Sequence, residues 1–197
     1  MSPKAFTEDE KKIVRSKLIE AAMKFLASTG IKKTTVEELA KAAGISKGAF
    51  YIFYESKELL FLDALEEEQA KIHKAIITNM QKYEDKKEGF VAVVSEMYRH
   101  FSTNTWMFSL MNDEYEVLLR RVPQERIAAH IALDDASTKR MTEVIAGMNI
   151  NSELVSAIMR MLFMSTLHRN EVGPLADDAF LFMLKAVADK IFSEEQP

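Results

Sequence analysis

The stretch from residue 35 to 57, TVEELAKAAGISKGAFYIFYESK, has the pattern of two short helices separated by a glycine turn. Thr35 and Glu38 have the spacing of a capping box, which begins a helix. Gly44 stands where a helix ends in the left-handed backbone conformation that glycine adopts at low cost. Ser46 is a favoured N-cap for the helix that follows. The stretch therefore predicts a helix-turn-helix, whose second helix fits the major groove of DNA.

The outer face of the second helix is expected to meet the DNA. If Phe50, Phe53 and Tyr54 point into the core, the opposite face holds Lys47 and Tyr51, which are neighbours because they are four residues apart. The tyrosine suits a thymine methyl or a phosphate oxygen. The full face comprises Ser46, Lys47, Gly48, Tyr51 and Ile52. The alternative is that the tyrosine and the isoleucine only pack against a neighbouring helix.

Composition indicates an all-α chain with a proper core. Of the 197 residues, 48% are hydrophobic, and no segment has the alternation of a strand. Cysteine is absent, which excludes disulfides and thiolate metal sites. No catalytic motif and no metal-ligand spacing of histidines appears, so neither an enzyme nor a cofactor is expected. No apolar run suits a signal peptide or a membrane span, so a cytoplasmic protein is expected.

The charge is distributed unevenly along the chain. Residues 1–60 hold 11 Lys and Arg against 8 Asp and Glu, whereas the whole chain has a net charge of −4. This asymmetry favours a DNA-binding head on an acidic body. Lys33, Thr34 and Thr35 lie just before a helix N-terminus, where lysines and free N–H groups can hold a phosphate. Ordinary solvated side chains beside a cap are the alternative.

The remaining chain predicts long helices, about nine in all. A helix over residues 57–83 would span roughly 40 Å and would connect the head to the rest. The others are expected at about residues 7–28, 90–102, 104–119, 123–146, 152–170 and 175–193. Two domains follow from this division: a helix-turn-helix DNA-binding domain over residues 1–56, and a ligand-binding and dimerisation domain over residues 57–197.

The last two helices are apolar over much of their circumference. One apolar face suffices for an intramolecular core, so a second face predicts a second partner, most simply a two-fold four-helix bundle. The expected dimer interface comprises Leu154, Ile158, Met161, Leu162, Phe180, Leu184 and Val187. Packing inside one larger bundle is the alternative.

Residues 25–60 resemble the tetracycline-repressor-like (TetR) regulators. The resemblance rests on Thr34-Thr35, Ala40, Ala43-Gly44, Ser46-Lys47-Gly48, Tyr51 and Ser56-Lys57-Glu58, which fall at the family's spacing. It implies a homodimeric transcription factor, usually a repressor, that a small molecule releases from a palindromic operator. A helical small-molecule-binding or scaffold protein with a non-functional DNA-binding head is the rival interpretation.

The resemblance also implies roles for individual residues. Thr35 and Lys57 would contact phosphates, and an isoleucine at position 52 departs from the polar residues common in the family. The expected DNA-contacting set is Lys33, Thr34, Thr35, Ser46, Lys47, Gly48, Ala49, Tyr51, Ile52 and Lys57.

An uncharged run, HFSTNTWMFSLMN over residues 100–112, suggests the effector site. It is rich in aromatic residues and methionine, which adapts to varied apolar ligands, although such residues also serve as ordinary core. A largely apolar effector is therefore expected. The candidate pocket comprises Met97, Phe101, Asn104, Trp106, Phe108, Met111, Phe163, Met164 and His168.

Overall fold

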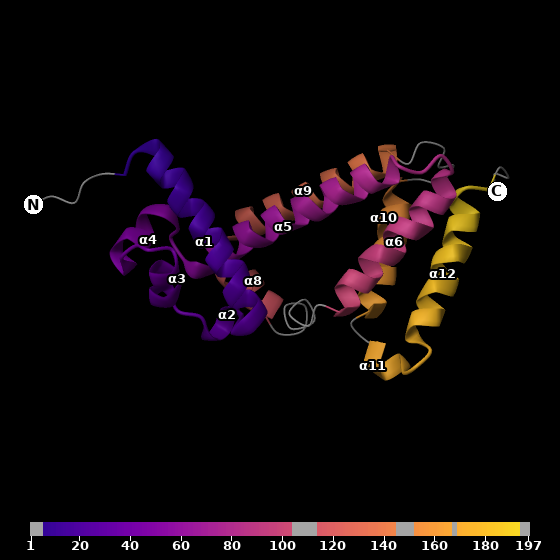
Figure 1. The fold of residues 1–197 in the computed structure, drawn as a ribbon. Coiled ribbons are helices and arrows are strands. Elements are labelled where there is room, and N and C mark those ends of the chain that lie inside the picture. The colour runs from indigo at the N-terminus through magenta and orange to yellow at the C-terminus, as the bar shows by residue number, and fades with distance from the viewer. Residues whose placement is uncertain (1–5, 104–113, 145–151, 167–168, 194–197) are drawn as a thin grey trace, which may run out of the picture. The chain divides into compact units, whose positions relative to one another are not determined.

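The computed structural model describes residues 6–103, 114–144, 152–166 and 169–193, and all regular structure in these ranges is helical (Figure 1). The predicted all-α class is thereby confirmed. The described helices are α1 (Glu8–Ser28), α2 (Gly30–Lys33), α3 (Val36–Ala42), α4 (Lys47–Phe53), α5 (Lys57–Met80), α6 (Lys86–Thr103), α8 (Tyr115–Arg121), α9 (Gln124–Val144), α10 (Ser152–Ser165), α11 (Arg169–Val172) and α12 (Ala176–Ile191). The four-residue helices α2 and α11 were not expected from the sequence, because one helical turn is too short to show a periodicity.

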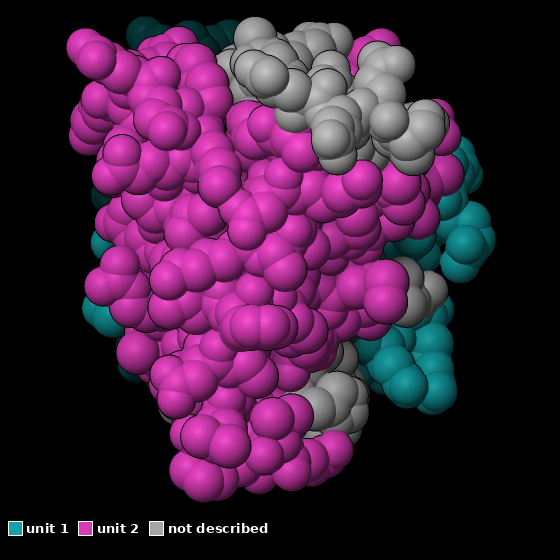
Figure 2. Space-filling view, turned by 90° about the vertical axis from the view of Figure 1, so that its right-hand side faces the viewer, with its two compact units in different colours: residues 1–69, 106–127 teal, residues 70–105, 128–197 magenta. Residues whose placement is uncertain are grey.

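The chain divides into two compact units, which Figure 2 shows in different colours. Unit 1 comprises residues 1–69 and 106–127, and unit 2 comprises residues 70–105 and 128–197. This grouping differs from the expected boundary after residue 56. The first half of α5 belongs with the helix-turn-helix, and so does α8, although it lies about sixty residues further along the chain.

Unit 1 is built around α1, whose start was predicted correctly. The Thr7 hydroxyl accepts the Glu10 N–H at 3.2 Å, and the Glu10 carboxylate accepts the Thr7 N–H at 2.8 Å, which is a complete capping box. The core beneath α1 contains fully buried side chains from α1 to α5 and from α8: Leu18, Ile31, Leu39, Phe50, Leu60, Phe61, Leu62 and Leu118. Leu118 therefore attaches α8 to unit 1 by the same apolar burial that holds the head together.

Ion pairs join α5 to the later segments of unit 1. Arg126 contacts Asp63 at 2.8 Å and Glu66 at 3.1 Å. Arg121 contacts the buried carboxylate of Glu58 at 3.5 Å. The two carboxylates around Arg126 raise the pKa of its guanidinium, Glu66 more than Asp63. These contacts fix α8 and the start of α9 along α5.

Unit 2 has its own apolar core and a set of polar contacts among Tyr98, Arg169 and Asp177, here called the latch. The Tyr98 ring stacks on the Phe180 ring with centroids 3.8 Å apart, and the Tyr98 hydroxyl donates to Asp177 at 2.6 Å. Arg169 also donates twice to Asp177, at 2.8 and 2.7 Å. The bonds from Arg169 and then from Tyr98 lower the pKa of Asp177 to about 2. The latch fixes the beginning of α12 against α6.

The expected dimer interface needs correction at three residues. Leu162, Phe180 and Leu184 are 6%, 2% and 0% exposed inside unit 2, so they belong to the core of the subunit itself. Ile158 and Val187 are partly buried against the same core. Leu154 and Met161 remain exposed on α10. The sequence overestimated the set because α10 and α12 are apolar on several faces, and one face is used internally.

Candidate nucleic-acid interface

The first helix of the predicted helix-turn-helix begins at a capping box. The Thr35 hydroxyl accepts the Glu38 N–H at 3.2 Å, while the Glu38 carboxylate accepts the Thr35 N–H at 2.8 Å and the Thr35 hydroxyl at 2.7 Å. The pKa of Glu38 is lowered most by the hydrogen bond from the Thr35 hydroxyl and next by the bond from the Thr35 N–H. The positive charge of Lys57 lowers it more weakly. The predicted start of α3 is confirmed.

The turn between α3 and α4 also follows the prediction. Gly44 has a φ of +75°, which strains any residue with a side chain. Its N–H donates to the Lys41 carbonyl at 3.1 Å, and the Ile45 N–H donates to the Ala40 carbonyl at 3.0 Å. The Ser46 hydroxyl then accepts the Ala49 N–H at 3.1 Å and caps α4. Hydrogen bonds therefore fix both ends of the turn.

Helix α4 buries one face and exposes the other. Phe50 and Phe53 lie in the core, whereas Tyr51 and Ile52 are 52% and 62% exposed. Ser46, Lys47 and Gly48 are exposed as well, and Ala49 is half-buried. The Tyr51 ring packs edge-on against the Phe50 ring, with centroids 5.5 Å apart. Within the described chain, Tyr51 and Ile52 are therefore not buried against a neighbouring helix.

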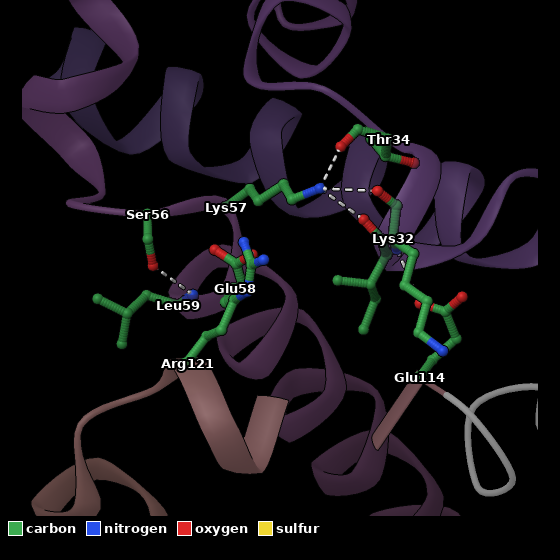
Figure 3. Close-up of polar contacts among 9 residues, drawn as sticks. Lys32, Thr34, Ser56, Lys57, Glu58, Leu59, Glu114 and Arg121 are labelled. Carbon is green, nitrogen blue, oxygen red and sulfur yellow. Dashed lines mark hydrogen bonds and ion pairs between the residues drawn. The ribbon is translucent and has the colours of Figure 1, made fainter. Parts of the chain in front are cut away.

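Not every expected DNA contact lies at the surface. Lys33 is exposed, but Thr34 is fully buried and its hydroxyl donates to the Gly30 carbonyl at 2.6 Å. We therefore correct the assignment of the Thr34 side chain to DNA. The Lys57 ammonium donates to the carbonyls of Ile31, Lys32 and Thr34 (Figure 3).

Sequence reasoning missed one residue of this region, Glu114. Its carboxylate accepts the Lys32 N–H at 2.9 Å across 82 residues of sequence, and its side chain is almost fully buried. No local spacing signals such a pair, because the partner segment lies in another part of the chain.

The expected effector pocket is only partly described. Phe101 and Phe163 meet edge-on with ring centroids 5.2 Å apart, Met97 is half-buried and Met164 is exposed. The other expected pocket residues lie outside the described residues: Asn104, Trp106, Phe108, Met111 and His168. Along the part of the chain that the structure describes, no helix is long and apolar enough to cross a membrane.

Comparison with known proteins finds a family that resembles the helix-turn-helix region. Residues 18–64 match the model of the family described as "Bacterial regulatory proteins, tetR family". The chain is 29% identical over 122 residues to the uncharacterized HTH-type transcriptional regulator YuxN of Bacillus subtilis, covering 58% of this chain and 42% of that protein. It is 28% identical over 130 residues to the HTH-type transcriptional repressor AcnR of Corynebacterium diphtheriae. That match covers 64% of this chain and 63% of AcnR. The matches thus span less than two thirds of these relatives.

Solved structures agree over nearly the whole fold. RolR in complex with resorcinol has a TM-score of 0.59 at 18% identity, with 97% of this chain and 98% of that chain covered. FadR of Thermus thermophilus in complex with lauroyl-CoA has a TM-score of 0.58 at 21% identity, with 93% and 97% covered. Because it contains a capped helix-turn-helix followed by further helices, the chain falls in the class of helix-turn-helix proteins. Within that class, residues 18–64 are similar to the tetR family of bacterial regulatory proteins.

The capping box at the start of α3 gives a direct stability prediction. Thr35→Ala removes the hydroxyl that accepts the Glu38 N–H, so it should lower the free energy of unfolding by about 1 kcal/mol. Thr35→Ser retains the hydroxyl and should cost much less. Urea unfolding of the two variants measures the difference, and equal losses would show that the cap contributes nothing.

Proposed function

We propose that this protein is a DNA-binding transcriptional regulator that acts as a homodimer on a palindromic operator. The observation that carries the proposal is the exposed face of α4, where Lys47, Tyr51 and Ile52 project from a helix whose turn and caps are fixed by hydrogen bonds. A short helix presented in this way fits the major groove. The match of residues 18–64 to the tetR family supports the same function, and the name of the relative AcnR supports repression.

The side chains on this face suit different parts of the groove. Lys47 can donate to guanine O6 or N7, or to a phosphate. Ile52 offers no hydrogen bond, so it is suited to a thymine methyl group. Gly48 leaves open space on the helix, because a Cβ there would meet nothing closer than the Ser46 hydroxyl at 4.0 Å. The DNA backbone can therefore approach α4 closely at that position.

A small molecule is proposed to control DNA binding. Two proteins of similar fold were crystallised with ligands that contain an aromatic ring or an apolar chain, resorcinol and lauroyl-CoA. In this chain the contact between Phe101 and Phe163 in unit 2 marks the proposed pocket. Helix α5 begins in unit 1 and ends in unit 2, so it is the proposed lever. A coupling of about 1–3 kcal/mol between ligand and DNA would change operator occupancy several-fold or more.

The test of the function is selection of binding sites from random DNA duplexes, followed by affinity measurements at several salt concentrations. A palindromic consensus bound by a dimer, with an affinity that falls steeply with salt, supports the proposal. Retention without any enriched sequence would favour the rival interpretation of a helical protein whose head has no DNA function. The protein is proposed to be cytoplasmic and to have no enzymatic activity.

Tyr51 should contribute to sequence discrimination. Tyr51→Ala removes a groove-facing ring, so it should weaken binding to the selected operator by about 1–3 kcal/mol while affinity for random DNA changes little. Ile13→Ala removes an equally exposed apolar side chain from α1 and is the matched control. Competition titrations measure both affinities. Equal losses on operator and random DNA would contradict the groove-facing assignment.

The exposed face of α10 should form the dimer interface. Leu154 and Met161 are exposed on this face, and the half-buried Ile158 lies between them, because the three residues are spaced by four and three positions. Met161→Glu places a charge on this face and should dissociate the dimer in sedimentation velocity. Ile131→Glu, at an exposed position on α9, is the control that should remain dimeric. A Met161→Glu chain that stays dimeric would remove α10 from the interface.

A core substitution separates loss of folding from loss of dimerisation. Leu184→Ala should lower the free energy of unfolding by about 2–5 kcal/mol, because its side chain is fully buried within unit 2. Met161→Glu should act mainly on the association equilibrium. Together these variants distinguish the subunit core from the proposed interface.

Effector binding should change the emission of the single tryptophan, Trp106. Resorcinol and lauroyl-CoA are suitable first probes, since proteins of similar fold bind them. A compound that releases DNA should shift or quench the emission at the same concentrations, and Trp106→Phe controls for background. Compounds that release DNA without any change in emission would place the effector site elsewhere.

A further inference from the structure

We propose that Lys57 and Glu114 are positioning residues that hold the short helix α2 and thereby place the N-terminus of α3. Both side chains form hydrogen bonds with the backbone of α2 (Figure 3). Lys57 is the first residue of α5, and Glu114 lies just before α8. We call these contacts of Lys57 and Glu114 with α2 the clamp, and they are a property of the free protein. Their consequence for DNA binding rests on the proposed function.

The ammonium group of Lys57 is fully engaged. It donates to the carbonyl of Ile31 at 2.7 Å, of Lys32 at 3.3 Å and of Thr34 at 2.5 Å. A lysine ammonium has three protons and no acceptor, so three carbonyls use all of its donors. The last carbonyls of a helix have no partner within the helix, and α2 ends at Lys33. Lys57 therefore acts as a C-terminal cap supplied by another helix.

This arrangement differs from the phosphate contact that the family resemblance implies for Lys57. A phosphate contact would require the ammonium to give up at least one charge-assisted bond to a carbonyl. Lys33 is exposed and needs no such exchange. The geometry therefore assigns Lys57 to the support of the interface and not to its surface.

Glu114 acts at the other end of α2. Its Oε2 accepts the Lys32 N–H at 2.9 Å, one of the first N–H groups of α2, which have no acceptor within the helix. Gly30 makes this approach feasible, since a Cβ there would lie 2.7 Å from Glu114 Oε1. The φ of Gly30 is +78°, which also favours glycine. The sequence at position 30 is thus constrained by both backbone conformation and the carboxylate.

The clamp is next to the cap of α3. Thr34 follows α2 directly, is fully buried, and its hydroxyl donates to the Gly30 carbonyl at 2.6 Å. The next residue is Thr35, the N-cap of α3. Fixing α2 at both ends therefore fixes the backbone from which α3 and the turn to α4 continue.

The first experiment compares Lys57→Met with Lys33→Met, which remove the same charge from positions 57 and 33. Amide hydrogen exchange is measured by NMR on the free full-length protein. In Lys57→Met, the Thr34 amide, which bonds to the Gly30 carbonyl, should exchange at least about tenfold faster. In Lys33→Met it should be unchanged. Unchanged exchange in both variants, or equal acceleration in both, would overturn the clamp.

Lys57→Arg distinguishes a clamp from a simple positive charge. The variant keeps the charge, but the planar guanidinium cannot aim three N–H groups from one nitrogen at three carbonyls. Faster exchange of the Thr34 amide is therefore expected here too, and wild-type protection would overturn the assignment. This variant also decides the question should Lys57→Met fail to fold.

Glu114 is tested by a pair of near-isosteric substitutions. Glu114→Met removes the acceptor and should accelerate exchange of the Lys32 amide at least about tenfold, whereas Glu114→Gln keeps an oxygen acceptor and should retain most of the protection. Equal exchange rates in the two variants would remove Glu114 from the clamp.

DNA binding supplies an independent readout. Lys57→Met should lower operator affinity without changing the slope of log affinity against log salt. Loss of a phosphate contact would instead reduce that slope by about 0.9 per protomer, and this outcome with normal α2 protection would overturn the proposal. If the wild-type protein bound no DNA, the proposed function would fail, while the exchange measurements would still decide the clamp.

Discussion

The region from α2 to α4 depends on hydrogen-bond partners for the backbone groups at the ends of very short helices. α2 has four residues, and α3 and α4 have seven each, which is far below the length at which an isolated helix is stable in water. Each therefore needs partners for its terminal N–H and carbonyl groups as well as a buried apolar face. Thr35 with Glu38 and Ser46 supply the partners for α3 and α4, and Leu39 and Phe50 supply the burial.

Sequence predicted the parts of this scheme that are local. A capping box acts over three residues and a glycine turn over about five, so Thr35, Gly44 and Ser46 could be read from spacing alone. The exposure of Tyr51 and Ile52 followed from the helical period of α4. The bonds of α2 could not be found this way, since Lys57 and Glu114 come from 23 to 26 and from 82 residues away. Spacing contains no information about such pairs.

The second unit shows a different limit of sequence reasoning. The apolar residues of α10 and α12 predicted burial correctly, but they did not say which face meets the core of the same chain. Leu184 is fully buried, whereas Phe182 is among the most exposed apolar side chains described. The direction is set in part by the latch of Tyr98, Arg169 and Asp177, which joins segments 79 residues apart. Periodicity therefore gives the number of apolar faces, and only the fold assigns each face to a partner.

In the helix-turn-helix region, the residues that support the helices differ from those proposed to read DNA. This difference has a consequence for how an operator preference is set. Thr34 and Lys57 are saturated by intramolecular bonds, so changes there should alter the scaffold for every DNA sequence alike. Lys47, Tyr51 and Ile52 are exposed and contribute little to the core, so changes there should alter sequence preference at small cost in stability. Ile52 illustrates the point, because its side chain is exposed and the hydrogen bonds that fix the turn join other residues. The residues proposed for recognition thus differ from those that support the helices, although both groups lie between positions 34 and 57 of the chain.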